Sequence, residues 1–177
     1  MKQTLIELFG TYAHEIIFLH VLSAFVWVGG MIAIRLAVHP NLQLIPDSSL
    51  RLERTLAIVG RFFHLVIPFI ILLILTAIIM AVGLGFRHAA VDPNGVVISE
   101  HAMYLYNLVH LKEIIWMVMS MNFTWMYLRR RKAQKYFEEG SLQDAKALMS
   151  IIPSRLLPIN IFLGIVALWV GITLRGF

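Results

Sequence analysis

Two histidines lie within long apolar stretches of the sequence. His20 falls in the run HEIIFLHVLSAFVWVGG at residues 14–30, and His110 falls in LVHLKEIIWMVM at 108–119. An ionisable side chain inside a membrane costs about a few kcal/mol unless it has a partner, so intramembrane histidines indicate a functional site. Two imidazoles on facing helices are the axial ligands that a b-type haem requires, without any covalent attachment motif. We therefore predict that His20 and His110 ligate the iron of haem b.

Two large side chains follow these histidines at helical spacing. Trp27 comes seven residues after His20, and Met117 comes seven residues after His110. Residues seven apart share one face of an α-helix, so Trp27 and Met117 are expected to flank a flat cofactor. The alternative is that both histidines are packing residues that only hydrogen-bond to neighbouring helices.

Two adjacent charged residues, Lys112 and Glu113, follow His110 in the same apolar stretch. Both cannot face lipid without a large cost, so at least one is expected to point into a helix bundle. Glu113 could orient an imidazole or carry protons, and Lys112 could pair with a carboxylate of a substrate. The alternative for Lys112 is that its long side chain extends outward to the membrane surface.

The same residue types are also compatible with other metal sites. Thioether and imidazole ligands suit Cu(I), and the stretch after His110 contains Met117, Met119 and Met121, of which only the first and last share a helix face. His39 and His64 form a second histidine pair that could bind metal in the opposite half of the membrane. The chain has no cysteine, so thiolate ligands and thiol redox chemistry are excluded.

Composition indicates an integral membrane protein. Of the 177 residues, 59% are hydrophobic and 14% charged, and the mean hydropathy is +0.80, far from the values of soluble domains. Four stretches are long enough to cross a hydrocarbon core about 30 Å thick: 14–38, 62–85, 104–128 and 156–174. We predict an all-α, antiparallel four-helix transmembrane bundle that forms a single domain over residues 1–177.

The basic residues predict the orientation of this bundle. Most of the 15 Lys and Arg residues lie at the connections that follow the first and third stretches: Arg35, Arg51, Arg54, Arg61, Arg129, Arg130, Arg131, Lys132, Lys135, Lys146 and Arg155. By the positive-inside rule these connections face the cytoplasm and both termini lie outside. The run RRRK at 129–132 is then a topology anchor at anionic lipid, and we expect no nucleic-acid partner. We expect a multi-pass protein of a bacterial-type cytoplasmic membrane.

Prolines predict where the helices end. Pro40 and Pro46 are expected to break the chain after the first stretch, and RLERTLAIVGRF at 51–62 to form a helical run-in to the second. A short amphipathic helix is expected within 136–153, with Ser141 as its cap and Pro153 at its end.

The apolar stretches also resemble a known superfamily. FLHVLSAFVWVGGM at 18–31, RFFHLVIPFIILLILTAI at 61–78 and the run at 108–119 are similar to the CopD membrane domain of copper-resistance proteins and to HemJ-type protoporphyrinogen oxidases. The HemJ motifs match these positions: Leu19, His20, Trp27, Arg35, Leu36, Glu53, Arg54, Lys112 and Pro153.

The resemblance implies a fold and a chemistry. HemJ-like proteins are small four-helix membrane proteins that bind haem b and oxidise protoporphyrinogen IX, and on that analogy Arg35, Arg54 or Lys112 would hold substrate carboxylates while Glu113 moves protons. The expected function is a haem-b membrane redox protein that oxidises a porphyrinogen or passes electrons to quinone. The alternatives are a CopD-like copper carrier and an accessory subunit without catalytic activity. A homo-oligomer is compatible with each of these functions.

Overall fold

The structure is a computed structural model that describes residues 2–174. The described residues are helical and contain no strand, apart from one isolated antiparallel bridge between Val91 and Val97. In chain order the elements are α1 (Lys2–Ala24), η1 (Phe25–Gly29), α2 (Gly30–Ala33), η2 (Ile34–Val38), α3 (His39–Gln43), α4 (Ser48–Gly83), α5 (Phe86–Ala90), α6 (Glu100–Glu138), α7 (Leu142–Ile151), η3 (Ile152–Leu156) and α8 (Leu157–Thr173). The η elements are π-helical. The all-α prediction is confirmed for this part of the chain.

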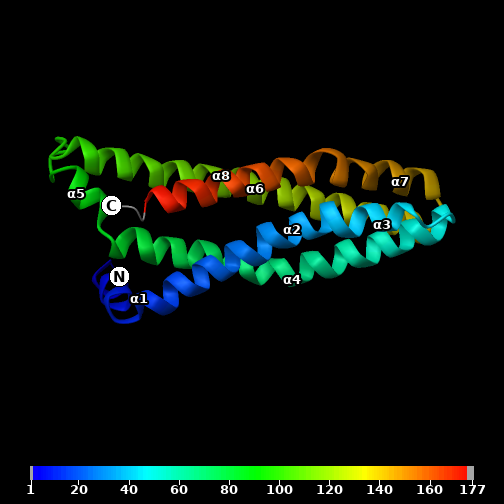
Figure 1. The fold of residues 1–177 in the computed structure, drawn as a ribbon, viewed down its shortest axis with the longest axis horizontal. Coiled ribbons are helices and arrows are strands. Elements are labelled where there is room, and N and C mark those ends of the chain that lie inside the picture. Colours follow the sequence, from blue (N-terminus) through cyan, green and yellow to red (C-terminus); the bar gives the residue numbers. More distant parts are fainter. Residues whose placement is uncertain (1, 175–177) are drawn as a thin grey trace.

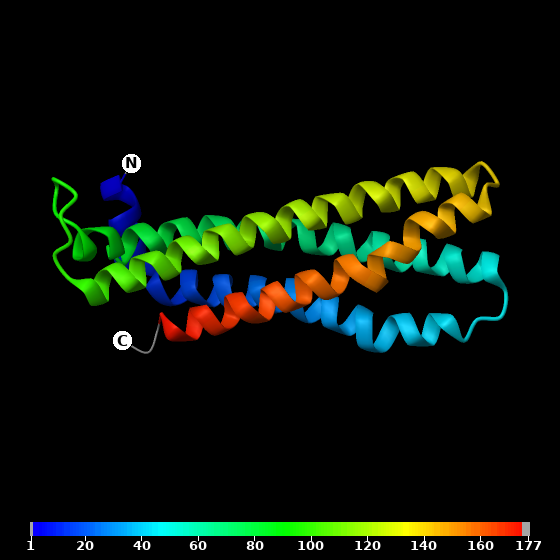
Figure 2. The ribbon, with the colours of Figure 1, turned by 90° about the horizontal axis from the view of Figure 1, so that it is seen from above.

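These elements join into four long rods that lie lengthwise beside one another (Figures 1 and 2). The first rod comprises α1, η1, α2, η2 and α3, the second is α4, the third is α6, and the fourth comprises α7, η3 and α8. The first rod packs on α4, and α6 packs on α4, α7 and α8. The start of α1, the end of α8 and the short helix α5 all lie at one end of the bundle, so successive rods run antiparallel (Figure 1).

Three segments are long and apolar enough to cross a membrane: Lys2–Gln43, Ser48–Ala90 and Leu142–Thr173. They contain the predicted stretches 14–38 and 62–85, and they contain the stretch 156–174 except for its last residue. The fourth predicted stretch, 104–128, lies in α6, which is long enough but less apolar because it carries Lys112, Glu113 and several uncharged polar side chains. Three of the four rods thus support membrane association, and α6 is not among them.

The rods are longer than the predicted stretches because the helices continue beyond the apolar runs. Helix α4 begins at Ser48, where the side chain of Asp47 accepts hydrogen bonds from the backbone N–H groups of Ser49 and Leu50. This confirms the predicted helical run-in. At the other end of the chain, α1 bends at Tyr12, whose φ and ψ of −121° and 34° are not helical.

Two of the predicted helix ends are wrong. Pro40 lies within α3, and the first rod ends only after Gln43, whereas Pro153 lies inside η3 and the chain continues from α7 into α8 without a break. A proline in a regular α-helix removes one backbone donor and clashes with the preceding turn. Here a π-helical turn precedes Pro40 and another contains Pro153. The wider turn accommodates the ring, so each rod remains continuous.

Aromatic and methionine side chains fill the centre of the bundle. Trp27, Met31 and Phe63 are almost completely buried. The ring of Phe123 on α6 meets the rings of Phe63 and Trp27 edge-on, at centroid distances of 4.9 and 6.1 Å. This core ties the first rod, α4 and α6 together, and it fixes which face of α6 points inward.

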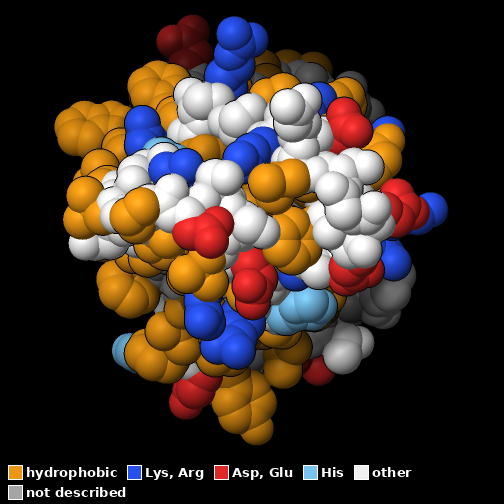
Figure 3. Space-filling view, turned by 90° about the vertical axis from the view of Figure 1, so that its right-hand side faces the viewer, with side chains coloured by type: hydrophobic (Ala, Val, Ile, Leu, Met, Phe, Trp, Pro, Cys, Tyr) orange, Lys and Arg blue, Asp and Glu red, His pale blue; other side chains and the backbone are white. Residues whose placement is uncertain are grey.

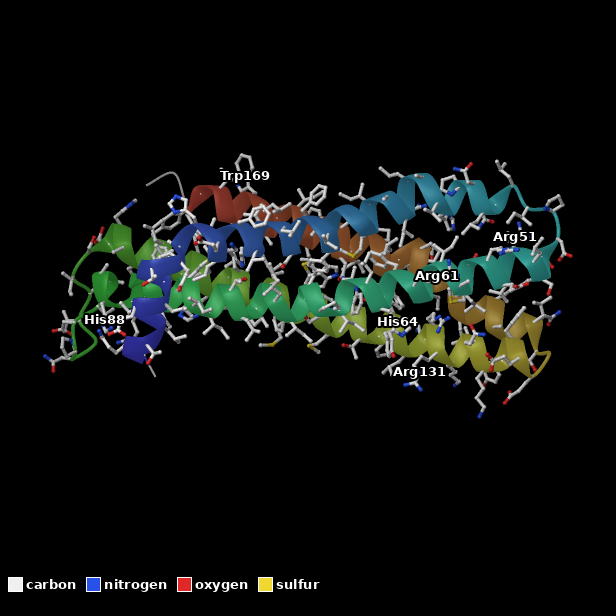
Figure 4. All side chains as sticks on the ribbon, turned by 90° about the horizontal axis from the view of Figure 1, so that it is seen from below. Arg51, Arg61, His64, His88, Arg131 and Trp169 are labelled. Atoms are coloured by element: carbon white, nitrogen blue, oxygen red, sulfur yellow. The ribbon has the colours of Figure 1, made fainter. Side chains whose placement is uncertain are left out.

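Charged side chains gather at the end of the bundle that carries α3 and α7. Lys and Arg side chains are mixed there with Asp and Glu (Figure 3). The arginines Arg51, Arg61 and Arg131 lie in this half, whereas His88 lies at the opposite end (Figure 4).

Candidate functional site

His20 projects from α1 toward α4, where it meets a threonine. Its Nδ1 atom lies 3.0 Å from Oγ1 of Thr76, and the pair is partly buried. The Thr76 hydroxyl lies 2.8 and 3.0 Å from the carbonyls of Leu72 and Leu73, to which it donates. A hydroxyl has one hydrogen and can also accept, so when Thr76 donates to one of these carbonyls it can accept a hydrogen bond from His20 Nδ1. In that arrangement the proton of the neutral imidazole is on Nδ1 and the lone pair is on Nε2.

Lys112 reaches the same region from α6. A Cβ atom at Gly171 of α8 would lie 3.2 Å from Lys112 Nζ, so the amine lies directly against the α8 backbone. Lys112 is also close enough to His20 to act on it electrostatically. His20, Thr76, Lys112 and Gly171 thus come from all four rods, and we call them the His20 cluster.

Among residues 2–174, no carboxylate forms an ion pair with the amine of Lys112. Among residues 2–174 the ion pairs are His110–Glu113 and Lys135–Glu139. An amine inside a bundle without a counter-ion is costly, and such residues mark sites for anionic or polar ligands. The His20 cluster therefore contains an imidazole and a cation.

His110 occupies a different surface. Its side chain is 48% exposed, and its Nδ1 lies 2.8 Å from Oε2 of Glu113, which is 55% exposed. The ring of Tyr106 contacts the His110 ring edge-on, with 4.5 Å between centroids. His110 and Lys112 are two residues apart and so point to nearly opposite sides of α6. The structure thus brings Lys112, and not His110, toward His20, and it places Glu113 with His110 on the outer face.

The two predicted flanking residues also separate. Trp27 is 1% exposed and lies in the core, where its Nε1 has no hydrogen-bond partner. Met117 is 56% exposed on the outer face of α6. Trp27 and Met117 therefore do not line one slot in this structure.

The inner histidines are not brought together either. His39 lines a small cavity of about 30 Å³ between η2, α4 and η3, which has room for about one water molecule. His64 is exposed, and its Nδ1 donates to the Gly60 carbonyl on its own helix at 2.8 Å. Among the described residues no three His, Cys, Asp or Glu side chains converge in a way that could hold a metal ion.

The two predicted arginines lie away from the His20 cluster. Arg35 is partly buried on η2, close enough to His39 to act on it electrostatically. Arg54 is exposed near the start of α4, about 33 Å along that helix from Thr76 at 1.5 Å per residue. Neither arginine can contact a small group held by His20.

The basic run at 129–132 divides into two roles. Arg129, Arg131 and Lys132 stack over Trp125, Tyr127 and Tyr136, at 5.5, 6.0 and 5.6 Å from the ring centroids. Arg130 instead turns toward α4, where its Nε and Nη2 donate to the Leu56 carbonyl at 3.1 and 3.0 Å. Three residues of this run thus contact aromatic rings of α6, and Arg130 links α6 to α4.

The sequence analysis missed several polar residues that join the rods. Asn160 is fully buried and donates to the Met119 carbonyl at 3.1 Å, while Asn122 donates to the Asn160 side chain and to the Leu156 carbonyl, both at 2.8 Å. Thr76 is the other omission. A single polar residue in an apolar run was the available signal in each case, because such a residue must find a partner within the bundle.

Comparison of the chain with protein families, with curated proteins and with solved structures finds no match.

Proposed function

We propose that this chain is a haem-b-binding membrane redox protein of the HemJ-like type, which oxidises a porphyrinogen or passes electrons to a membrane acceptor. The observation that carries the proposal is the hydrogen bond between His20 Nδ1 and Thr76. Histidines that bind metal usually donate the second ring N–H to a fixed acceptor, which orients the ring and directs the other nitrogen to the metal. His20 has this arrangement, with Nε2 as the ligating atom.

Haem b, when bound, would supply one-electron chemistry. His20 fits as an iron ligand because it is partly buried and its Nδ1 is held by a side chain of another helix. Lys112 fits as the residue that would bind a carboxylate of the cofactor or substrate, since it is a cation that forms no ion pair among residues 2–174. The outward direction of His110 does not favour it as the opposite ligand in this packing, so the proposal depends on His20.

We propose further that α6 crosses the membrane as the fourth span. It packs along α4, α7 and α8 over its length, and a helix in this position would share the bilayer with its neighbours. With the basic connections inside, the start of α1 and the end of α8 lie outside a bacterial-type cytoplasmic membrane. Reporter fusions near Gly140 and after the last residue would report opposite sides.

The absorption spectrum of the detergent-purified protein tests the function. A reduced b-type α-band is expected for the wild-type chain, and its loss in His20→Ala is expected because the axial bond is removed. The matched control is His14→Ala, an exposed histidine on the same helix, which should keep the band. Copper without haem would favour the CopD-like alternative, and the absence of both would favour an accessory subunit.

A further inference from the structure

Three of the rods meet in a tightly packed layer that lies further from the α5 end of the bundle than the His20 cluster. A Cβ atom at Gly164 of α8 would lie 2.6 Å from Cγ2 of Val28 on η1 and 3.4 Å from Cε of Met119 on α6. Val28 and Met119 are 5% and 3% exposed, and Gly164 is buried. We call these three residues the packed layer. A space that does not accept one methyl group does not let a ligand pass, so the packed layer closes the space between the first rod, α6 and α8.

The His20 cluster lies one level above the packed layer, toward the α5 end. The first rod and α6 run away from that end, and α8 runs toward it (Figure 1). Counted from the packed-layer residue on the same rod, His20 lies eight residues, and Lys112 and Gly171 seven residues, nearer to the α5 end. At 1.5 Å per residue, each of them lies about 10–12 Å beyond the packed layer. The three residues therefore lie at matching heights on three rods.

Exposure increases from the packed layer to the His20 cluster. His20, Lys112 and Gly171 are each partly exposed. Within residues 2–174 the Lys112 amine makes no hydrogen bond, and it is not shut away from contact as the indole nitrogen of Trp27 is. A ligand can therefore reach the Lys112 amine without a rearrangement of the core.

The Lys112 amine also lies close to the end of α8. Trp169 projects away from the bundle (Figure 4), so Gly171, two residues further on, faces nearly the opposite way, toward α6. Helix α8 ends at Thr173, about 3 Å along the axis from Gly171. The first rod meets α8 through η1 and α2, whereas α1 packs mainly on α4. The contacts that close the bundle thus lie on one side of the His20 cluster, and the end of α8 lies on the other.

We propose that the His20 cluster opens at the α5 end of the bundle and that Lys112 binds the carboxylate of an organic anion that enters from that side. A cation without an ion-pair partner favours an anionic ligand, and the packed layer is the floor on which the ligand stops. In the orientation proposed above, the anion arrives from outside the membrane. This inference rests on the proposed function for the identity of the ligand, and it adds the side of entry.

Thiol reactivity tests the side of entry. The chain has no cysteine, so Gly171→Cys provides a single thiol beside the amine, and its Cβ meets only the flexible end of the Lys112 side chain. Sealed vesicles of both orientations, containing the full chain, are treated with the membrane-impermeant anion methanethiosulfonate ethylsulfonate. Gly171→Cys should react on one side of the membrane. The control Ser49→Cys, exposed at the start of α4, should react only on the opposite side.

The charge of the reagent tests the role of Lys112. The measured quantity is the reaction rate with the ethylsulfonate divided by the rate with its cationic trimethylammonium analogue. Addition of Lys112→Met to Gly171→Cys should lower this ratio about fivefold, because a positive charge beside the thiol favours the anion and disfavours the cation. Addition of Lys112→Met to Ser49→Cys should leave the ratio unchanged.

Equal ratios with and without Lys112 would overturn the proposal, as would reaction of Gly171→Cys on the same side as Ser49→Cys. Lys112→Cys tests access with Gly171 retained. If neither Gly171→Cys nor Lys112→Cys reacts with the ethylsulfonate, the cluster is closed at the α5 end, and if membrane-permeant N-ethylmaleimide then reacts, it opens to lipid. Either result overturns the proposal. The haem spectrum is measured separately, so failure of this entry site and failure of the haem proposal are distinguishable.

Discussion

His20 and His110 have the same residue type and both lie in predicted membrane-spanning stretches, but their environments are opposite. His20 lies between rods with its Nδ1 bonded to Thr76 of another helix. His110 lies on the surface of α6, and its partners Glu113 and Tyr106 belong to the same helix. A hydrogen bond to a second helix positions the His20 ring before any ligand binds, whereas the partners of His110 do not fix its ring relative to another helix. The position of a histidine in an apolar stretch therefore does not define a site unless the rotation of its helix is also known.

The rotation of α6 is set by its buried residues. Ile115, Met119, Phe123 and Met126 are buried and recur at spacings of four and three residues. Lys112 lies three residues before Ile115 and so continues this inward stripe. The contrast between Lys112 and His110 is thus a contrast between the inner and outer faces of one helix.

The largest effect is expected for His20→Ala. Loss of the axial nitrogen should remove most of the bound haem, while His110→Ala should retain most of it, because His110 points away from the cluster. Haem content per protein, from absorption of the purified variants, measures the difference. Added imidazole should partly restore the band in His20→Ala, since a small base can occupy the space. Equal losses of haem in the two variants would contradict the difference between His20 and His110. They would indicate that His110 is the second iron ligand.

Thr76→Val should have the next largest effect on haem. The valine keeps the shape of threonine but removes the hydroxyl that holds His20 Nδ1, so haem affinity should fall about tenfold or more. The thermal midpoint should also fall, since the loss of a partly buried hydrogen bond costs about 1 kcal/mol. Haem titration and thermal unfolding measure the two effects. Thr173→Val removes an exposed hydroxyl on α8 and should change neither.

Lys112→Met should stabilise the protein while weakening carboxylate binding. Removal of an unpaired amine from the bundle relieves its desolvation cost, so the thermal midpoint of the ligand-free protein should rise by about a few degrees. Affinity for a dicarboxylate porphyrin should fall relative to that for its diester. Lys132→Met is the control, because Lys132 is exposed at the end of α6. A lower midpoint in Lys112→Met would mean that the amine has a stabilising partner.

The smallest effect on haem content is expected for Glu113→Gln. The carboxylate is more than half exposed and pairs with the outer histidine, so haem content should remain near the wild-type level and stability should change by about 0.5 kcal/mol or less. Proton-coupled reduction should slow if Glu113 transfers protons, and stopped-flow reduction at several pH values measures this rate. Unchanged kinetics would remove Glu113 from the mechanism.

The sequence was sufficient for the helical architecture but not for the rotation of α6. Long apolar runs determine where helices lie, because an unpaired backbone is not tolerated in lipid. The same apolar composition prevents prediction of which helix face points inward, since lipid-facing and core-facing residues are similarly apolar. Methionine at 119 is buried and methionine at 121 is exposed, although their residue type is the same. The contacts of Phe123 with Phe63 and Trp27 resolve the ambiguity, and they depend on residues far apart in the chain.

The prolines show a second limit of prediction from the sequence. A proline in a sequence pattern predicts a helix end, and that rule fails at Pro40 and Pro153 because π-helical turns absorb the ring. The wider turn depends on packing against neighbouring rods, which no local pattern records. The roles of Thr76 and Gly171 could not be predicted for the same reason, since each role depends on a side chain that another helix places beside the residue.

The lengths of α4 and α6 have a consequence for access to the protein. These helices contain 36 and 39 residues, so they are about 54 and 58 Å long, against a hydrocarbon core of about 30 Å. The predicted spans 62–85 and 104–128 lie toward the α5 end, so in the proposed membrane orientation most of the excess length would project from the membrane on the side of α3 and α7. A water-soluble molecule that contacts this projecting end would then be held about 15–20 Å above the hydrocarbon surface.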